Sequence, residues 1–348
     1  MEHRQAAGNQ TLKQIARDLN LSLMSVSRAL HGQKGVSEET RRRVLEHARH
    51  VHYRPNLAAR TLVRRRAQVL GVIFPSLGQT FWADIVRSIE QVAKANGYTV
   101  LFAHAGDRAE VEREEIHTLL ARQVDALLVA SSDPEGNIDV LRQVHGSDRP
   151  LVLFDRYAEG LNAPGVFCDD RDGARRATEH LIGLGYRRVV HLAGPANLSV
   201  ARDRRRGYED AMRAAGLPER VVECGFGEEA GRQGMRDLLE AGVEVEAVFA
   251  AHDPVAFGVM DVVSERGLRI PEDVALVGFT DVDHARHLAV PLTVMAQPTA
   301  EMGEATARLA LDLLAGRVPP DTRIVLPARL IVRASCGAQR RAQEASGG

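Results

Sequence analysis

Several short polar segments hold residues whose types could bind or transform a small molecule. Asp155 follows the apolar run Leu151–Phe154, His252-Asp253 follow Ala247–Ala250, and Thr280-Asp281 follow Ala275–Phe279. Further candidates of this kind are Phe81, Trp82, Arg204, Phe226 and Gln297. Carboxylates, a guanidinium, an imidazole and aromatic rings together suit the recognition of a small polar molecule.

The pair His252-Asp253 also has the composition of a general acid–base pair. A structural role is favoured, because Asp253 directly precedes Pro254 and can cap a helix that begins there. The sequence holds no Gly-x-Ser-x-Gly, no Gly-x-x-x-x-Gly-Lys and no Gly-x-Gly-x-x-Gly after a predicted strand. A binding protein is therefore favoured over an enzyme, and we predict no catalytic residue and no cofactor.

The cysteine pattern gives no metal site. Cys168, Cys224 and Cys336 are odd in number and lack the spacing of metal ligands, which favours a reducing compartment over a disulfide scaffold. No apolar run reaches the roughly 18 residues of a membrane span, and the first ten residues contain no apolar core of a secretory signal. We expect a soluble, cytoplasmic protein that binds no membrane.

Residues 11–30 predict a pair of short helices separated by a turn at Asn20–Ser22. In the first helix the apolar residues follow the i, i+3, i+4, i+7 spacing of one helix face, namely Leu12, Ile15, Ala16 and Leu19. Thr11 can cap the first helix and Ser22 the second. This pattern is typical of a helix-turn-helix, although any small antiparallel helical pair could share it.

Polar residues of the second helix suit nucleic acid. Val26, Ala29 and Leu30 can face the first helix, which leaves Ser25, Ser27 and Arg28 outward. Hydroxyls suit phosphates and a guanidinium suits guanine. Residues 1–66 hold 14 basic against 5 acidic residues, a net charge of +9, whereas the remainder holds 31 against 41, a net charge of −10. This asymmetry favours a nucleic-acid-binding head on an acidic body.

A third helix and a linker follow the pair. Ser37 can cap the third helix, and Glu38 and Glu39 suit its first turn. This helix should end near Tyr53–Pro55, because the residue before a proline avoids helical geometry. The next helix-capable stretch, Asn56–Leu62, is too short to be stable alone in water.

From Gln68 onward, apolar runs alternate with helical stretches in two series, which predicts parallel sheets in two doubly wound lobes. In such lobes ligands bind beyond the carboxyl ends of the strands, so the polar segments above should converge on a cleft. The predicted strands are residues 69–74, 99–103, 126–130 and 151–154, then 188–193, 247–250 and 275–279, with short strands at 324–326 and 330–332. The predicted helices are residues 82–96, 111–122, 172–184, 204–215, 254–266 and 300–314.

Seven motifs in order along the chain resemble the LacI/GalR family of bacterial transcription regulators. In the head they are SVSRALHG, GVSEETRRRVLEHA and YRPNLAARTL. In the body they are GVIFPSLGQTFWADIVRSIEQVAKANGY, RRGYEDAMRAAGLP, RIPEDVALVGF and PLTVMAQPTAEMG. The resemblance extends over essentially the whole chain.

The resemblance implies a homodimer whose two heads bind the half-sites of a near-palindromic operator in double-stranded DNA. It places Leu23, Met24 and Arg28 at the bases, and Ser22, Ser25 and Ser27 near phosphates, with Thr11 also at the interface. Asn56, Ala59 and Leu62 match the family's hinge, in which the leucine enters the minor groove. Leu23 and Met24 stand where polar residues are common, and Leu23 could instead belong to the core.

For the body, the resemblance implies a fold similar to periplasmic sugar-binding proteins, with a small-molecule effector in the cleft. Phe81 and Trp82 match the aromatic pair of the pocket, Arg204 the arginine that grips the effector, and Phe226 a stacking aromatic. Trp82 could instead be core, and Arg204 could belong to a charged surface run with Arg205 and Arg206. His252 and Thr280 replace an asparagine and an aspartate that are common in the family, which would suit an anionic effector such as a sugar acid or phosphosugar.

The sequence therefore predicts a metabolite-controlled transcription regulator, most simply a repressor. Alternatives are an activator, a transport-type binding protein and an enzyme. The expected organisation is a helix-turn-helix domain at 1–53, a hinge at 54–66, a body at 67–336 and a disordered tail at 337–348. Lobe 1 should comprise about 67–160 and 298–322, and lobe 2 about 161–293 and 323–336.

Overall fold

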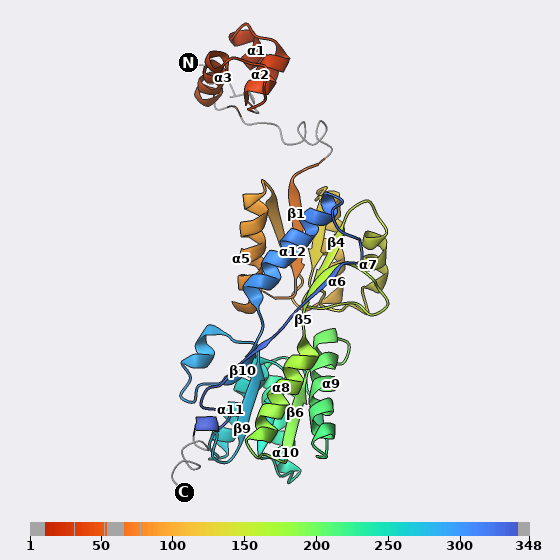
Figure 1. The fold of residues 1–348 in the computed structure, drawn as a ribbon, viewed down its shortest axis with the longest axis vertical. Coiled ribbons are helices and arrows are strands. Elements are labelled where there is room, and N and C mark those ends of the chain that lie inside the picture. The colour runs from red at the N-terminus through yellow and green to blue at the C-terminus, as the bar shows by residue number, and fades with distance from the viewer. Residues whose placement is uncertain are drawn as a thin grey trace, which may run out of the picture. The chain divides into compact units, whose positions relative to one another are not determined.

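A helical head and a larger α/β body make up the computed structural model (Figure 1). The head lies within Met1–Ala67 and the body within Gln68–Gly348. The structure describes residues 11–30, 32–51, 53, 66–76, 78 and 80–339. The predicted hinge residues Asn56, Ala59 and Leu62 lie outside the described residues.

Three helices build the described part of the head, as the sequence predicts: α1 (Leu12–Asp18), α2 (Leu23–Leu30) and α3 (Glu38–His50). Their caps are also those predicted. Thr11 caps α1, the Ser25 amide donates to Ser22 Oγ at 3.0 Å, and Ser37 caps α3. The three helices close over a small apolar core that contains Ile15, Val26, Ala29 and Val44.

Lobe 1 of the body is a six-stranded sheet between two helical layers. The strand order is β11-β5-β4-β3-β1-β2, and all neighbours are parallel. Its strands are β1 (Val69–Phe74), β2 (Thr99–His104), β3 (Ala126–Val129), β4 (Leu151–Phe154), β5 (Gly165–Cys168) and β11 (Arg323–Leu326). One face carries α5 (Thr80–Ala95) and α12 (Thr299–Leu314), and the other carries α6 (Ala109–Ala121) and α7 (Ile138–His145).

Lobe 2 repeats this architecture with the order β12-β10-β9-β8-β6-β7. Its strands are β6 (Val189–Ala193), β7 (Val221–Glu223), β8 (Ala247–Ala250), β9 (Ala275–Phe279), β10 (Thr293–Ala296) and β12 (Arg329–Ile331). The pair β10–β12 is antiparallel and the other pairs are parallel. One face carries α8 (Asp170–Gly183) and α9 (Ser199–Ala214), and the other carries α10 (Glu228–Glu240) and α11 (Asp253–Glu265), with a short 3-10 helix at Asp283–Arg286. The two doubly wound lobes are confirmed.

The predicted lobe boundaries are wrong at two strands. β5 and β11 were expected in lobe 2, but they pair with each other and extend the sheet of lobe 1. The chain thus passes between the lobes three times, from β5 to α8, from β10 to α12 and from β11 to β12. The crossing from β10 to α12 lies where it was predicted. The crossing from β5 to α8 comes later than predicted, because the alternation of strand and helix continues through it.

The predicted disordered tail begins too early. Gly337 is buried, and Ala338 packs against the main apolar cluster, so residues 337–339 belong to the body. Gly185, Gly216 and Gly267 do follow their helices with positive φ, as helix C-caps require. No helix in the described residues is both long and apolar enough to cross a membrane.

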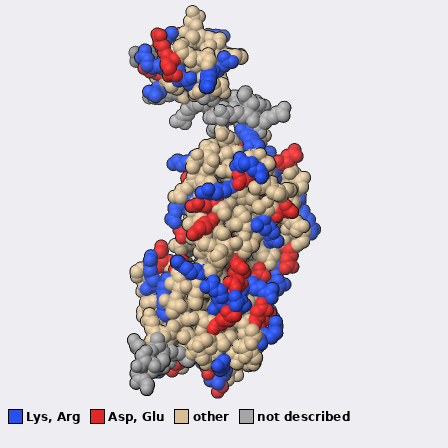
Figure 2. Space-filling view, viewed as in Figure 1, with Lys and Arg blue, Asp and Glu red and all other residues tan. Residues whose placement is uncertain are grey.

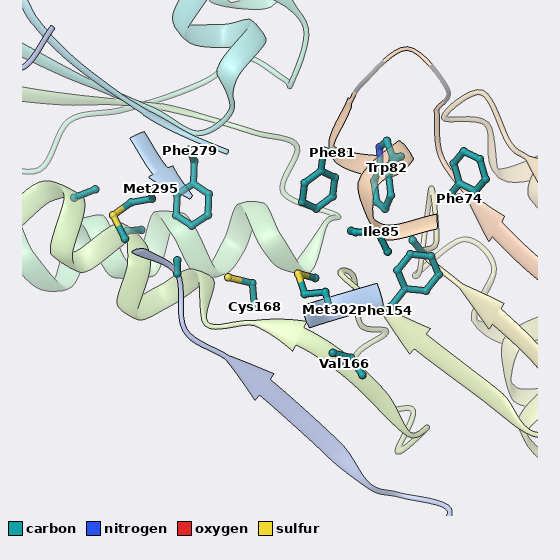
Figure 3. Close-up of a cluster of buried hydrophobic side chains, with 14 of the residues drawn as sticks. Phe74, Phe81, Trp82, Ile85, Phe154, Val166, Cys168, Phe279, Met295 and Met302 are labelled. Carbon is teal, nitrogen blue, oxygen red and sulfur yellow. The ribbon is translucent and has the colours of Figure 1, made fainter. Parts of the chain in front are cut away.

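One apolar cluster runs through both lobes and supports the inner ends of their strands. In lobe 1 it includes Trp82 and Phe154, and in lobe 2 it includes Phe249 and Phe279. Figure 3 shows Phe81 and Trp82 at the start of α5, with Phe154 nearby, and Phe279 beside Met295. Continuous packing of this kind fixes the backbone from which the cleft residues project.

Candidate functional site

A cavity of about 400 Å³ lies between the lobes, at the carboxyl ends of their strands. From lobe 1 and its crossover it is lined by Phe81, Trp82, Asp107, Ser132, Asp155, Arg156 and Gln297. From lobe 2 it is lined by Pro195, Asn197, Leu198, Val200, Arg204, Phe226, Gly227 and His252. Its volume suits a molecule the size of a mono- or disaccharide.

Seven of the ten residues predicted at an effector site line this cavity: Phe81, Trp82, Asp155, Arg204, Phe226, His252 and Gln297. The other three do not. Asp281 pairs with Arg333 at 2.8 Å instead. Thr280 lies behind Gln297, to which its hydroxyl donates at 2.9 Å. Asp253 is buried in the first turn of α11, and the predicted cap is wrong, because the N-cap position is His252 and no side chain caps this helix.

Aromatic rings form the apolar surfaces of the cavity. The rings of Phe81 and Trp82 meet edge to face at 4.9 Å between centroids, and Trp82 meets Phe154 at 6.2 Å. Trp82 is therefore both a core residue and a lining residue. On lobe 2, the Phe226 ring lies 5.2 Å from the His252 ring. Such surfaces suit the apolar face of a ring-shaped ligand.

Arg204, in α9, is held firmly by the protein itself. Its Nε donates to Asp170 Oδ1 at 2.8 Å, its Nη2 lies 2.7 Å from the same oxygen, and its Nη1 donates to the Ala251 carbonyl at 2.7 Å. The guanidinium also lies 3.9 Å from the Phe279 ring centroid. Arg204 is 2% exposed. The alternative that it belongs to a surface run is wrong, and most of its donors are already used.

Arg156, after β4, is held loosely by comparison. Its Nη1 donates to the Ser131 carbonyl at 3.0 Å, and its guanidinium lies 5.7 Å from the Trp82 ring centroid. Its carboxylate neighbours lie beyond hydrogen-bond length, at 3.7 Å from Nε to Asp155 Oδ2 and 3.8 Å from Nη1 to Asp107 Oδ1. The buried Nε has no hydrogen-bond partner among the described residues. A buried donor in this condition is costly unless a ligand or water completes it.

Asp155, Gln297 and Thr280 form a hydrogen-bonded chain between the lobes. Gln297 Nε2 donates to Asp155 Oδ1 at 3.4 Å, and its Oε1 accepts from Thr280. Asp155 has φ +61° and Thr280 has φ +83°, a region that residues other than glycine rarely adopt. Strain of this kind concentrates at ligand sites, where the surrounding structure enforces it.

A buried carboxylate supports the loop after β3. Glu112 of α6 accepts from Ser131 Oγ at 2.6 Å, from Asn137 Nδ2 at 3.0 Å and from the Ser132 amide. These bonds hold the chain at Ser131, whose carbonyl accepts from Arg156, and at Ser132, which lines the cavity.

Burial shifts the protonation of several groups around the cavity. Desolvation raises the pKa of Asp253 to about 7 and also raises the pKa of Asp155. Desolvation, with the charges of Arg204 and Arg156, lowers the pKa of His252 well below its usual value. His252 is thus a neutral imidazole near pH 7. The described residues hold no cluster of three or more His, Cys, Asp or Glu that could bind a metal.

A polar seam joins the two lobes beside the cavity, where α9 begins. The Tyr157 hydroxyl donates to Asp203 at 2.9 Å, and the Tyr157 amide donates to Ser199 Oγ at 3.0 Å. Arg202 contacts Glu135 at 2.9 Å and Glu159 at 3.3 Å. These contacts join lobe 1 to lobe 2 in the arrangement of the lobes that this structure shows.

The head presents the predicted interface residues at the start and along the outer side of α2. Leu23 and Met24 are 48% and 63% exposed, so the alternative that Leu23 is core is wrong. Ser22 Oγ and Ser25 Oγ are hydrogen bonded at 2.8 Å. Arg28 is exposed, and its guanidinium lies close to Gly35. Figure 2 shows lysine and arginine side chains distributed over the head.

Sequence reasoning placed Arg156 and Asn197 in segments that converge on the cleft without assigning either a role, and it missed Asp107 and Ser132. The signal for the two missed residues was available. Asp107 and Ser132 follow β2 and β3, and the rule that ligands bind at strand ends applies to those strands as well.

Comparison with known proteins identifies relatives of both units. Residues 11–56 match bacterial regulatory proteins of the lacI family, and residues 178–336 match a periplasmic binding protein-like domain. The ribose operon repressor of Haemophilus influenzae is 32% identical over 88% of this chain and 92% of its own length. The lac repressor dimer bound to operator and anti-inducer superposes with a TM-score of 0.85, at 26% identity over 94% of this chain and 99% of that one. A complex of the transcriptional regulator CelR with cellobiose gives a TM-score of 0.72, at 31% identity over 94% and 99% of the two chains.

Proposed function

The chain belongs to the lacI family of bacterial regulatory proteins, and from that premise we propose that a small metabolite in the cavity controls its repression of transcription. The head supplies a capped helix-turn-helix and the body supplies a cavity between two lobes. Relatives over nearly the whole length are named as a ribose operon repressor and as a transcriptional repressor. In the function we propose, a homodimer binds a near-palindromic operator through two copies of α2.

The metabolite is a polyhydroxylated molecule of the sugar class. The observation that carries this assignment is the pair of gaps at Arg156, 3.7 Å to Asp155 and 3.8 Å to Asp107. A hydroxyl can accept from the guanidinium and donate to a carboxylate, so one hydroxyl beside each pair, within hydrogen-bond distance of both atoms, would satisfy both neighbours. The relatives named for ribose and cellobiose support this class.

A neutral sugar fits the lining better than a sugar acid or a phosphosugar. Arg204 already has Asp170, and Arg156 lies between two carboxylates. His252 adds no charge near pH 7, because its pKa is lowered by burial. An anionic group would therefore meet no excess of positive charge, contrary to what the exchanges at His252 and Thr280 suggest in the sequence alone.

Control of operator binding requires that the metabolite have different affinities for two arrangements of the lobes. In this proposal the hinge residues Asn56, Ala59 and Leu62 link the arrangement of the lobes to operator binding, and Leu62 enters the minor groove. In the head, Thr11, Ser22, Ser25 and Ser27 lie near phosphates, and Leu23, Met24 and Arg28 face the bases. This function places the protein in the cytoplasm with the DNA and requires no catalysis.

A ligand panel with the full-length chain tests the proposal. Sugars, sugar acids and phosphosugars are screened by thermal shift, where a ligand at about 100 times its Kd adds about 2.7 kcal/mol of stability. The enantiomer of each hit serves as the control. Operator binding is then measured with and without the hit, and a change in Kd in either direction supports the proposal.

Other outcomes contradict it. A hit that leaves DNA affinity unchanged indicates a transport-type binding protein, and a hit that is consumed indicates an enzyme. Among the supporting outcomes, a hit that strengthens DNA binding identifies a co-repressor, and one that weakens it identifies an inducer. A response limited to acids or phosphorylated sugars overturns the preference for a neutral ligand.

A further inference from the structure

The first two residues of α2 are exposed apolar side chains in a basic domain. Leu23 is 48% and Met24 63% exposed, and they are the head's two large exposed apolar side chains among the described residues. In contrast, Val26 and Ala29 of the same helix are at most 1% exposed. Leu23 and Met24 therefore lie off the face by which α2 packs on its neighbours.

Their position on the helix is that of base-reading residues. In a helix-turn-helix, the N-terminal residues of the second helix contact base edges in the major groove. The neighbouring hydroxyls of Ser22 and Ser25 bond to each other, and Ser22 also caps the helix. Arg28 lies one turn further along, close to Gly35. Leu23 and Met24 thus form the leading surface of α2.

The chemistry of these side chains restricts what they can recognise. Neither offers a strong hydrogen-bond donor, and Leu23 offers no acceptor, so they cannot match the polar pattern of a base pair. In the major groove, the apolar group available to them is the C5 methyl of thymine. Residues 11–53 hold eight lysines and arginines against four acidic residues, and this charge favours a polyanion over an apolar protein partner.

We infer that Leu23 and Met24 recognise thymine methyl groups, so that each operator half-site carries adjacent thymines opposite the start of α2. The inference rests on the proposed function of the head as a DNA-binding domain. It assigns base preference to apolar contact at these two residues and leaves hydrogen-bonded readout to Arg28.

The test distinguishes failure of the thymine inference from failure of the proposed DNA-binding function. Full-length protein first selects binding sequences from random duplexes. In the selected duplex, each thymine is then replaced by deoxyuridine, which removes the methyl and keeps the pairing. We expect one or two adjacent positions per half-site to lose about three- to tenfold in affinity, the size expected for one buried methyl.

Variants assign the effect to residues. Leu23→Ala and Met24→Ala should each lose the discrimination at the position that the truncated residue contacts, and the double variant should bind the thymine and deoxyuridine duplexes equally at those positions. Met24→Gln keeps a long, exposed side chain, and it should also lose the discrimination without a change in the helical circular dichroism. Arg42→Gln, an exposed change on α3, should bind more weakly but keep the full discrimination.

Each remaining outcome is decisive. Selection that enriches no sequence overturns the DNA-binding function, and the inference falls with it. An enriched sequence that tolerates deoxyuridine at every position overturns the inference alone. Discrimination that survives in the double alanine variant also overturns it.

Discussion

The two walls of the cavity present an arginine each, and the two arginines are in opposite conditions. On lobe 2, Arg204 is fixed by Asp170, the Ala251 carbonyl and the Phe279 ring. On lobe 1, Arg156 has one hydrogen bond to a carbonyl, two carboxylates beyond bonding distance and a buried Nε without a partner among the described residues. The sequence motif singles out Arg204, whereas the unsatisfied donor belongs to Arg156.

This difference suggests that one arginine supports the wall of the cavity and the other recognises the ligand. A fully bonded guanidinium in a dry site stabilises the protein around it and has little left to offer a ligand. A guanidinium with open donors gains most when a ligand arrives. We therefore expect lobe 2 to supply a preformed wall and lobe 1 to supply the contacts that discriminate among ligands.

Loss of Arg204 should give the largest effect. Arg204→Ala leaves Asp170 buried without its partner, which costs about 3–5 kcal/mol. Urea unfolding of the body, followed by the fluorescence of Trp82, measures the change. Arg205→Ala, on the same helix with its side chain 48% exposed, is the control. A variant as stable as that control would show that Arg204 does not support the wall.

Loss of Arg156 should separate affinity from stability. Arg156→Gln should weaken binding of the sugar found in the panel by about 10- to 100-fold, the effect of losing charge-assisted hydrogen bonds. The melting temperature without ligand should fall much less than for Arg204→Ala. Isothermal titration calorimetry measures the affinity, with Arg205→Gln as the control. Unchanged affinity would remove Arg156 from the recognition surface.

The dependence of unfolding free energy on pH tests a buried carboxyl of lobe 2, Asp253, which follows the lining residue His252. The pKa of Asp253 is about 7 in the folded protein and 3.8 in its ordinary state. Between these values the folded protein binds more protons than the unfolded chain, so this group's contribution to stability falls as the pH rises from about 4 to 7. We expect wild type to lose on the order of 3 kcal/mol relative to Asp253→Asn across that window. A difference in unfolding free energy that stays constant with pH would contradict this.

The smallest expected effect concerns the chain of hydrogen bonds that joins the walls. Thr280→Val removes the hydroxyl that orients Gln297 and should weaken sugar binding by roughly three- to tenfold, the value of one hydrogen bond. Thr280→Ser keeps the hydroxyl and should bind nearly as wild type does. If serine and valine behave alike in calorimetry, the hydroxyl has no role in positioning Gln297.

Local patterns in the sequence predicted most of the elements but missed β5, β7, β10, α7 and α10, and they carried no information on distant pairing. Helix caps at Thr11, Ser22 and Ser37 are local and were found. The placement of β11 in lobe 1 depends on its pairing with β5, more than 150 residues earlier, and no periodicity carries that information. Residues at strand ends were predicted as lining, but which of them bond each other was not. Asp281 turns to Arg333 and Thr280 to Gln297, contacts that depend on side-chain geometry rather than on residue type.

The three crossings between the lobes determine when the protein can fold during synthesis. The sheet of lobe 1 starts with β1 at Val69 and is complete only when β11 has paired with β5, at Leu326. At about 5–20 residues per second, translation separates these strands by roughly 10 to 50 s. For the later part of that interval, from the synthesis of β5 to that of β11, the edge of β5 is open to wrong partners. The nascent chain must therefore carry a half-built sheet on the ribosome, and a message truncated before β11 yields neither lobe in finished form.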